Sequence, residues 1–372
     1  MCDETALLHT RYATCLPSCV VNVWARLLIY RLPISIARAM YQERRKYYSE
    51  LESIRESKVL MYFTSDRRGM PAKIATDAVD LFVKHLDAIG DVEKITLYLY
   101  SQGGGISAAW TLINLIRGFC KHLEVVVPRK AHSAATLICI GADNLIMTKQ
   151  ATLGPIDPSI ETALNPAIDG AQGRYPVSVE AVSGFLDFAR NALGKEADLT
   201  STLLALADRV HPLVLGDAYR IRGQIRMLAR KLLPNQLGED GDIETVLRFL
   251  ASESGSHDYT INRREAKEEL GLTIEKPNDE LYALIKIIYD DVARELDLYS
   301  TFDPNIILGQ AQQGTYKAKR AFIESVDGGS HYFGTEGTVQ RHNIRLQSGV
   351  VRPVIQDTRT FDGWRHDEPA TT

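Results

Sequence analysis

The amino-acid sequence predicts an α/β fold that continues into a helical extension and a C-terminal β-hairpin. Short β-rich runs alternate with amphipathic runs over residues 58–147, which is typical of strands joined by right-handed helical crossovers. Helical patterns dominate residues 178–298, and β-rich patterns return from about Asn305. With 372 residues the chain is long enough for one large core with appendages.

The first half contains four predicted strands and the helices that flank them. Charged residues with apolar ones at helical spacing predict an entry helix over residues 36–58. The predicted strands are Lys58–Thr64, Lys94–Tyr100, Leu123–Val127 and Leu145–Met147. The predicted helices that follow them are 72–89, 106–119 and 133–141.

The second half is predicted to be helical before it becomes β-rich. The predicted helices are 178–194, 199–233, 242–253, 263–270 and 278–298. Asp327-Gly328-Gly329 predicts a hairpin turn, because these residue types tolerate positive φ. We expect four segments: an N-terminal helical segment 1–57, a core 58–233, a helical extension 234–300 and a β-rich tail 301–372.

The charge balance argues against a general nucleic-acid binder. Forty-three Lys and Arg against 47 Asp and Glu give a net charge of −4, whereas such binders are usually basic. One basic run interleaves with apolar residues and is interpreted as the solvated face of an amphipathic helix. It contains Arg220, Arg222, Arg226, Arg230 and Lys231.

The five scattered cysteines argue against a disulfide framework and favour a reducing, cytoplasmic location. Cys15 and Cys19 have a C-x3-C spacing, but no second pair of Cys or His residues lies nearby to complete a zinc site. We therefore predict neither a metal nor a cofactor.

The apolar segment from Cys15 to Met40 predicts no transmembrane helix. Arg26, Arg31 and Pro33 interrupt it before it reaches the length that a bilayer requires. The residues before it are acidic and do not form the basic start of a signal peptide. Burial against the protein or another subunit is the simplest interpretation, with a membrane-surface helix as the alternative.

The strand ending at Tyr100 runs directly into Ser101-Gln102-Gly103-Gly104-Gly105. Glycine exposes backbone N–H groups without a Cβ in the way. The spacing fits no dinucleotide- or nucleotide-binding loop. The run therefore favours backbone donors aimed at an oxyanion, with a plain tight turn as the alternative.

The second motif, His132-Ser133-Ala134-Ala135-Thr136, opens a predicted helix. The positive field of a helix N-terminus stabilises a serine alkoxide or a tetrahedral oxyanion. The alternative is an ordinary N-cap serine.

The third motif is Leu153-Gly154-Pro155-Ile156-Asp157-Pro158. Its prolines predict a rigid turn that presents one carboxylate, Asp157, at a defined place. Asp157 could equally cap its own turn.

Together, and in this order, the three motifs resemble the serine dehydrogenase proteinase family, which is related to signal peptide peptidase A and Clp peptidase. Further similar segments are His211-Pro212-Leu213 and the run from Ser256 through INRREAKEELGL, so the resemblance covers roughly residues 58–300. It implies a Clp/crotonase-type core of repeated ββα units and a peptidase acting on peptides or proteins. Since such proteins assemble, it also implies a homo-oligomer.

By this resemblance Ser133 stands at the position of the nucleophile. Gly103, Gly104 and the amide of Ala134 stand at the oxyanion-hole positions. Family members commonly have glycine where this chain has Ala135. The extra methyl group of Ala135 is expected to narrow the active site.

The general base is the weakest part of the resemblance. Clp peptidases have a histidine in the segment similar to LGPIDP, whereas signal peptide peptidases have a lysine where this chain has Arg174. Arginine does not deprotonate at useful pH. A permuted triad of Ser133, His257 and Asp157 is chemically reasonable, with His211 as the alternative base and Asp258 as an alternative carboxylate near the site. Either histidine could equally be structural, and His132 is disfavoured because it adjoins Ser133.

Three functions remain open at this stage. The first is a serine peptidase, and the second is a catalytically inactive scaffold or partner-binding oligomer of the same fold. The third, an acyl-CoA enzyme of the crotonase type, fits less well, because no adenine-contacting basic segment is evident.

Overall fold

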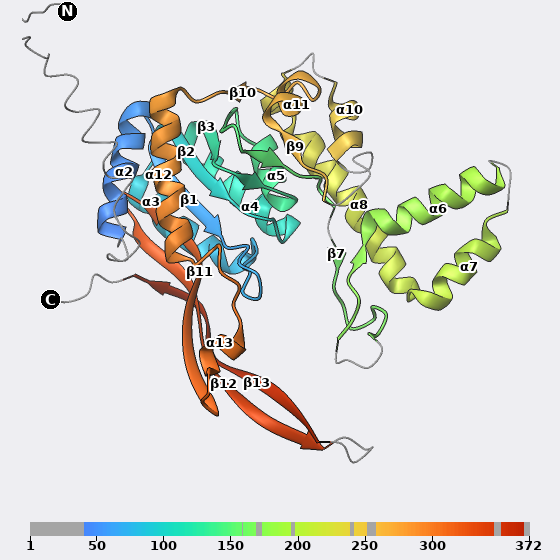
Figure 1. The fold of residues 1–372 in the computed structure, drawn as a ribbon. Helices are drawn as coiled ribbons and strands as arrows, with labels where there is room; N and C mark the ends of the chain where they lie inside the picture. Colours follow the sequence, from blue (N-terminus) through green and yellow to red (C-terminus); the bar gives the residue numbers. More distant parts are fainter. Residues whose placement is uncertain are drawn as a thin grey trace, which may run out of the picture. The chain divides into compact units, whose positions relative to one another are not determined.

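An eight-stranded mixed sheet carries the main hydrophobic core (Figure 1). The computed structural model describes residues 41–157, 159–168, 173–194, 198–238, 242–250, 258–345 and 351–367. In spatial order the strands are β10 (Ile274–Glu275), β5 (Asn144–Met147), β3 (Cys120–Val127), β2 (Val92–Tyr100), β1 (Lys58–Thr64), β11 (Gln313–Ser325), β12 (Gly329–Arg345) and β13 (Val351–His366).

The two halves of this sheet differ in strand direction. Strands β1, β2, β3, β5 and β10 are parallel to one another, as the predicted crossovers require. Strand β11 pairs antiparallel with β1, and β12 and β13 extend the antiparallel half. The predicted α/β class is confirmed.

Helices cover both faces of the parallel half. Leu97 and Leu99 of β2 lie in one cluster with α3 (Val79–Ile89), α4 (Ile106–Arg117) and α5 (Ala134–Ile140). Tyr98 and Tyr100 lie in a second cluster with α2 (Tyr41–Arg55) and α12 (Asp279–Glu295). Since successive side chains of a strand point to opposite faces, these two clusters are the two faces of the sheet.

A buried arginine ties α2 to the second face. The guanidinium of Arg44 is fully buried and donates to Glu324 at 2.7 and 2.8 Å and to Asp291 at 2.7 Å. The charge of Arg44 and hydrogen bonds from Arg44, Tyr48 and Ser330 hold the pKa of Glu324 below its usual range, although burial alone would raise it. A buried cation is tolerated because carboxylates surround it.

The predicted helix 199–233 is wrong as a single element. The structure has α7 (Thr200–Arg209) and α8 (Pro212–Leu232), with Val210 and His211 extended between them. Pro212 explains the break, because the residue before a proline is driven away from helical φ and ψ. The remaining helices in the described part of the chain are 3-10 helix η2 (Thr76–Ala78), α6 (Val179–Leu193), α9 (Pro234–Leu237), α10 (Ile243–Arg248), α11 (Arg263–Glu268) and α13 (Pro304–Leu308).

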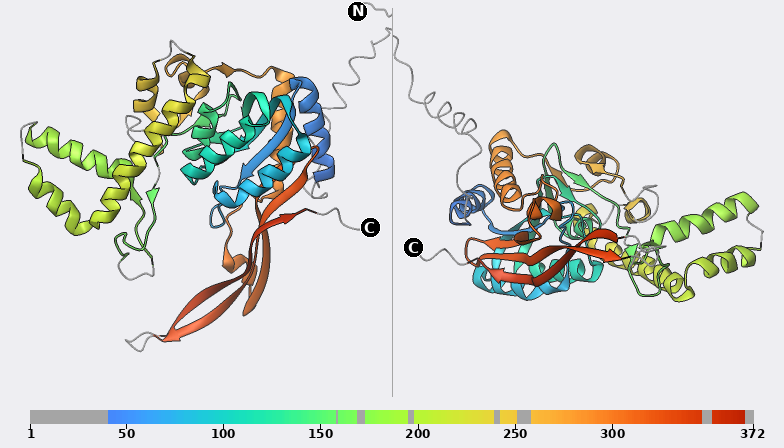
Figure 2. Two further views of the ribbon diagram at one scale, coloured as in Figure 1. Left: turned by 180° about the vertical axis from the view of Figure 1, so that it is seen from behind. Right: turned by 60° about the horizontal axis from the view of Figure 1, so that its bottom comes forward.

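The predicted C-terminal hairpin is confirmed. Ser325 pairs with Gly329 across the turn, and Gly329 has φ of 79°. Figure 2 shows β11, β12 and β13 as one antiparallel ribbon. No helix among the described residues combines the length and the apolar character needed to cross a bilayer.

Two small sheets lie outside the main one. The first has the order β4 (Lys130–Ala131), β6 (Thr152–Leu153) and β9 (Ile261–Asn262). In the second, β7 (Ser159–Ile160) pairs with β8 (Val177–Ser178). Each strand of the first sheet adjoins one of the motifs singled out in the sequence.

Candidate active site

The conformation of the glycine loop after β2 is fixed by backbone hydrogen bonds to a neighbouring segment. Gly103 and Gly104 have φ of 105° and 151°, which disfavour any side chain. Ile74 donates its N–H to the carbonyl of Gly103 at 2.9 Å, and its carbonyl accepts from Gly105 at 2.8 Å. A methyl group on Gly104 would lie 2.3 Å from the carbonyl oxygen of Ile74, so this position requires glycine.

Asp66 fixes the same loop from the side. It accepts hydrogen bonds from Lys130 at 2.6 Å, Tyr100 at 2.9 Å and Gln102 at 3.0 Å. Burial alone would raise the pKa of Asp66, but the hydrogen bond and charge of Lys130 lower it below its usual range. The carboxylate is therefore charged at neutral pH. It links the glycine loop and the end of β2 to Lys130 of β4.

Ser133 occupies a strained turn at the start of α5. Its φ of 51° and ψ of −117° are unusual for a residue with a side chain and cost about 1–3 kcal/mol. Ser133 is 8% exposed, and its hydroxyl makes no hydrogen bond with any described residue. An N-cap serine normally bonds an amide of the first turn, so ordinary capping does not explain this residue.

The glycine loop and Ser133 lie against each other. A methyl group on Gly103 would be 2.8 Å from Cβ of Ser133 and 3.1 Å from the amide nitrogen of Ala134. The N–H of Gly103 donates to the Ser101 hydroxyl at 2.9 Å. In contrast, neither the N–H of Gly104 nor that of Ala134 donates to a described residue. These two amides are available to a ligand.

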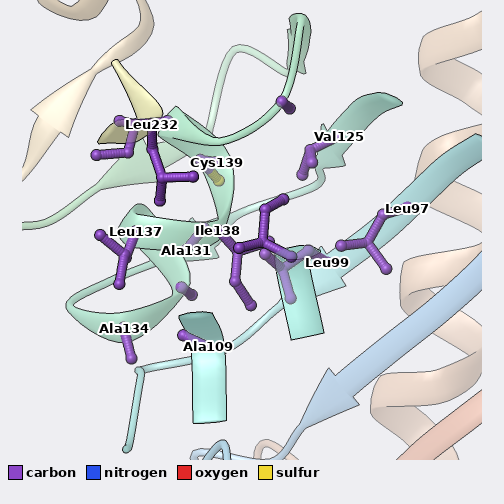
Figure 3. Packing of buried hydrophobic residues seen from close by; sticks show 14 of the residues in the cluster. Leu97, Leu99, Ala109, Val125, Ala131, Ala134, Leu137, Ile138, Cys139 and Leu232 are labelled. Carbon is purple, nitrogen blue, oxygen red and sulfur yellow. The ribbon is translucent and has the colours of Figure 1, made fainter. Parts of the chain in front are cut away.

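Helix α5 is anchored in the core behind Ser133. All seven of its residues are buried, and Figure 3 shows Leu137, Ile138 and Cys139 among side chains of the sheet and of α8. Burial raises the pKa of the Cys139 thiol above its usual range. Ala135 is also buried, so its methyl group packs inside the protein.

Asp157 caps a different helix. It is buried and accepts from the Ser178 hydroxyl at 3.1 Å and from the amide of Glu180 at 3.3 Å, at the N-terminus of α6. The preceding residue, Ile156, donates its amide to the carbonyl of Leu250 at 2.8 Å. Asp157 therefore joins the third motif to α6.

The small sheet β4-β6-β9 brings three sequence segments to one edge. Ala131 pairs with Leu153, and Leu153 pairs with Ile261. Ser133 follows β4 directly, the Asp157 segment follows β6, and Asp258 precedes β9. Because β9 runs antiparallel to β6, the chain before β9 lies at the same edge as the chain after β6.

The structure describes one of the two histidines predicted as the general base, His211. His211 is an exposed N-cap whose Nδ1 accepts from the amide of Leu213 at 3.2 Å. It lies at the opposite end of α8 from Leu232, which faces Gly141 at the end of α5. Since α8 is about 30 Å long, His211 is far from Ser133. His257 lies outside the described residues.

His132 is held against the third motif. Its Nε2 bonds the Thr152 hydroxyl at 2.9 Å, and a methyl group on Gly154 would lie 3.0 Å from its ring. Arg174, which the sequence predicted to stand where signal peptide peptidases have a lysine, donates to the carbonyl of Asn165 at 2.9 Å. Neither residue is a hydrogen-bond partner of the Ser133 hydroxyl.

Sequence reasoning missed two hydroxyl groups that shape this site. Ser101 accepts from Gly103, and Thr136 bonds Ala131 and Gly154. Both stand inside motifs that the sequence did single out. The Thr64 hydroxyl also donates to Ser101 at 2.7 Å, and Gly154 follows Thr136 by 18 residues, so these contacts join segments that no local pattern pairs.

Residues 14–175 match the family model of the ClpP-like SDH-type serine proteinases. The predicted resemblance is thereby confirmed for this segment, which contains all three motifs. Two relatives are uncharacterized proteins of Methanocaldococcus jannaschii. MJ0137 is 26% identical over 71% of this chain and 86% of its own length; MJ1495 is 24% identical over 48% and 51%.

Solved structures show weaker similarity. A membrane-bound stomatin-specific protease, 1510-N, is 15% identical over 57% of this chain and 79% of its own, with a TM-score of 0.35. ClpP1 from Listeria monocytogenes is 13% identical over 62% of this chain and 99% of its own, with a TM-score of 0.34.

Proposed function

We propose that this chain is a serine peptidase in which the Ser133 hydroxyl attacks a peptide carbonyl. The observation that carries the proposal is the strained turn of Ser133, beside the glycine loop and at the start of α5. Strain of this kind persists where the surrounding structure over-determines it and is common at catalytic residues. The family match over residues 14–175 supports a peptidase-like function.

We further propose that the amides of Gly104 and Ala134 bind the oxyanion. Both N–H groups remain available among the described residues, and Gly103 adjoins the Ala134 amide. Gly103, which the sequence predicted as an oxyanion donor, is not assigned that role, because its own N–H bonds the Ser101 hydroxyl. Two preorganised amides stabilise the tetrahedral intermediate more than the planar substrate, which is what accelerates acyl transfer.

The proposed general base is His257, oriented by Asp157 as predicted from the sequence. It is supported by the neighbouring residue Asp258, which leads into β9 and so reaches the edge of the small sheet that Ser133 leaves. The alternative base, His211, is disfavoured by its exposed position at the far end of α8. His257→Ala should reduce hydrolysis at least about a hundredfold, as loss of a general base does, whereas the matched variant His211→Ala should retain it.

One observation favours the second candidate, an inactive scaffold of the same fold. No described group hydrogen bonds the Ser133 hydroxyl, so no described group is placed to take its proton. The scaffold would bind partners through the same fold without turnover.

A fluorophosphonate probe separates the two candidates. Wild-type protein should be labelled, Ser133→Ala should not, and Ser107→Ala, which removes an exposed serine of α4, should be labelled like wild type. Labelling that persists in Ser133→Ala would remove Ser133 from the mechanism. Absence of labelling in wild type across the pH range would favour the scaffold.

Light scattering tests the accompanying prediction of a homo-oligomer. A monomer would count against that prediction.

A further inference from the structure

Thr136 connects the nucleophile turn to the third motif. It lies in the first turn of α5, three residues after Ser133, and is fully buried. Its hydroxyl contacts the carbonyl of Ala131 at 2.8 Å and the carbonyl of Gly154 at 2.7 Å. The amide of Gly154 in turn donates to the same oxygen at 3.2 Å.

These contacts use the proton of the hydroxyl and one of its two lone pairs. Its single proton is shared between two carbonyls, while its oxygen accepts one N–H. Ala131 ends β4 and leads into Ser133, and Gly154 follows β6 and leads into Asp157. One side chain therefore fixes both segments at the edge of the small sheet where they converge.

We propose that Thr136 is a positioning residue that fixes Ser133 relative to the segment Gly154–Asp157. The inference rests on the proposed peptidase function and deepens it. The strained φ of Ser133 needs support from its surroundings, and Thr136 supplies it by bonding the carbonyl of Ala131, two residues before Ser133. Small misplacements of a nucleophile are costly, since reaction requires the attacking atom in near-attack geometry.

The decisive variant is Thr136→Val, which keeps the shape of the side chain and removes the hydroxyl. Three buried backbone groups then lose a partner. We expect the rate of fluorophosphonate labelling at Ser133 to fall between about tenfold and a hundredfold, and kcat to fall more than KM changes. Thr136→Ser, which keeps the hydroxyl, should recover most of the rate.

A matched control distinguishes positioning from general stability. Thr148 is likewise buried, donates to the carbonyl of Pro128 at 2.7 Å and accepts from the amide of Gln150 at 3.2 Å. Thr148→Val should lower the Tm by a similar amount but leave the labelling rate unchanged. An equal loss of rate in the two valine variants, or a wild-type rate in Thr136→Val, would overturn the proposal.

A second readout does not depend on catalysis. In Thr136→Val, hydrogen exchange should speed up at the amides of Leu137 and Ile156, which bond Ser133 and Leu250. Thr148→Val should not change them. If wild type is unlabelled but exchange rises only in Thr136→Val, the peptidase function fails while the positioning role stands. Unchanged exchange in Thr136→Val would overturn the positioning role by itself.

Discussion

The segment around Ser133 is packed differently from α6, α7 and the N-terminal half of α8, whose C-terminal half joins the same core as α5. All residues of α5 are buried, whereas α7 buries none of its ten residues. Phe188 of α6 is 68% exposed, and Tyr219 of α8 is 84% exposed. The turn of Ser133, the proposed nucleophile, is thus anchored in the core of the chain, while these helices keep apolar side chains that the described residues do not cover.

Asp157 lies where these two regions meet. Its backbone continues the segment that Thr136 holds, while its carboxylate caps α6. A short helix owes most of its stability to tertiary packing. Substitutions in the core around Ser133 should therefore lower the free energy of unfolding strongly. Substitutions on the exposed helices should lower it only slightly.

The largest expected effect comes from the buried cation. Arg44→Ala should lower the free energy of unfolding by about 3–5 kcal/mol, because it leaves Glu324 and Asp291 buried without their partner. Arg230→Ala, which breaks the exposed pair with Glu244, should cost less than about 1 kcal/mol. Urea denaturation measures both. Equal losses would contradict the contrast between the regions.

Glycine substitutions should change stability in opposite directions. Gly104→Ala should lower the free energy of unfolding by at least about 2 kcal/mol, because its methyl group meets the Ile74 backbone at a strained φ. Gly184→Ala, inside α6 with open space around it, should raise it by about 0.5–1 kcal/mol. Thermal unfolding of the two variants checks the signs. A stable Gly104→Ala protein would show that the loop can relax.

Loss of the Asp157 carboxylate should have an intermediate effect. Asp157→Ala removes the acceptor for Ser178 and for the amide of Glu180, which should cost about 1–3 kcal/mol. Amide exchange at Glu180 should rise. The control Asp187→Ala removes only an exposed pair with Arg190 and should change neither quantity. If both variants behaved alike, Asp157 would not couple the two regions.

Acid should weaken the core side through a histidine cluster. His85 bonds Ser325 and His331, and the rings of His331 and His366 meet edge-to-face. Burial and the neighbouring imidazoles lower the pKa of His85 to about 3, while burial, His366 and Lys84 lower that of His331 to about 4.

Both histidines therefore stay neutral in the folded protein while the unfolded chain takes up protons near pH 6.5. The stability that they contribute above pH 6.5 should be lost as the pH falls toward 4. We expect the Tm to drop between pH 7 and pH 5, and to drop less in His331→Asn. An identical pH dependence in the variant would exclude this cluster as the cause.

The smallest effect should come from the exposed apolar stripe of α6, which consists of Phe185, Phe188 and Leu193. Phe188→Ser should change the free energy of unfolding of a dilute sample by less than about 0.5 kcal/mol, as a surface substitution does. Unfolding at several protein concentrations is the measurement. A larger loss that grows with protein concentration would show that another copy covers this stripe.

Much of this architecture could be predicted from sequence, because it follows local patterns. Runs of β-forming residues predicted the strands ending at Tyr100 and Val127, and the glycine pair after Asp327 predicted the hairpin turn. The break before Pro212 also has a local cause, yet the continuous helical pattern on both sides hid it. The partners of Arg44 lie more than 240 residues away, and no local pattern reveals them.

The sequence by itself determined which residues could do chemistry: the glycine loop, Ser133 and the Asp157 segment stand out by residue type and order. Only the tertiary structure decided which of their polar groups are already bonded inside the protein. It occupied the amide of Gly103, left those of Gly104 and Ala134 available, and moved His211 away from Ser133. The physical reason is that each backbone amide has a single N–H to donate. An amide that meets an acceptor inside the protein is therefore no longer available to a ligand, and only the folded chain decides which groups meet.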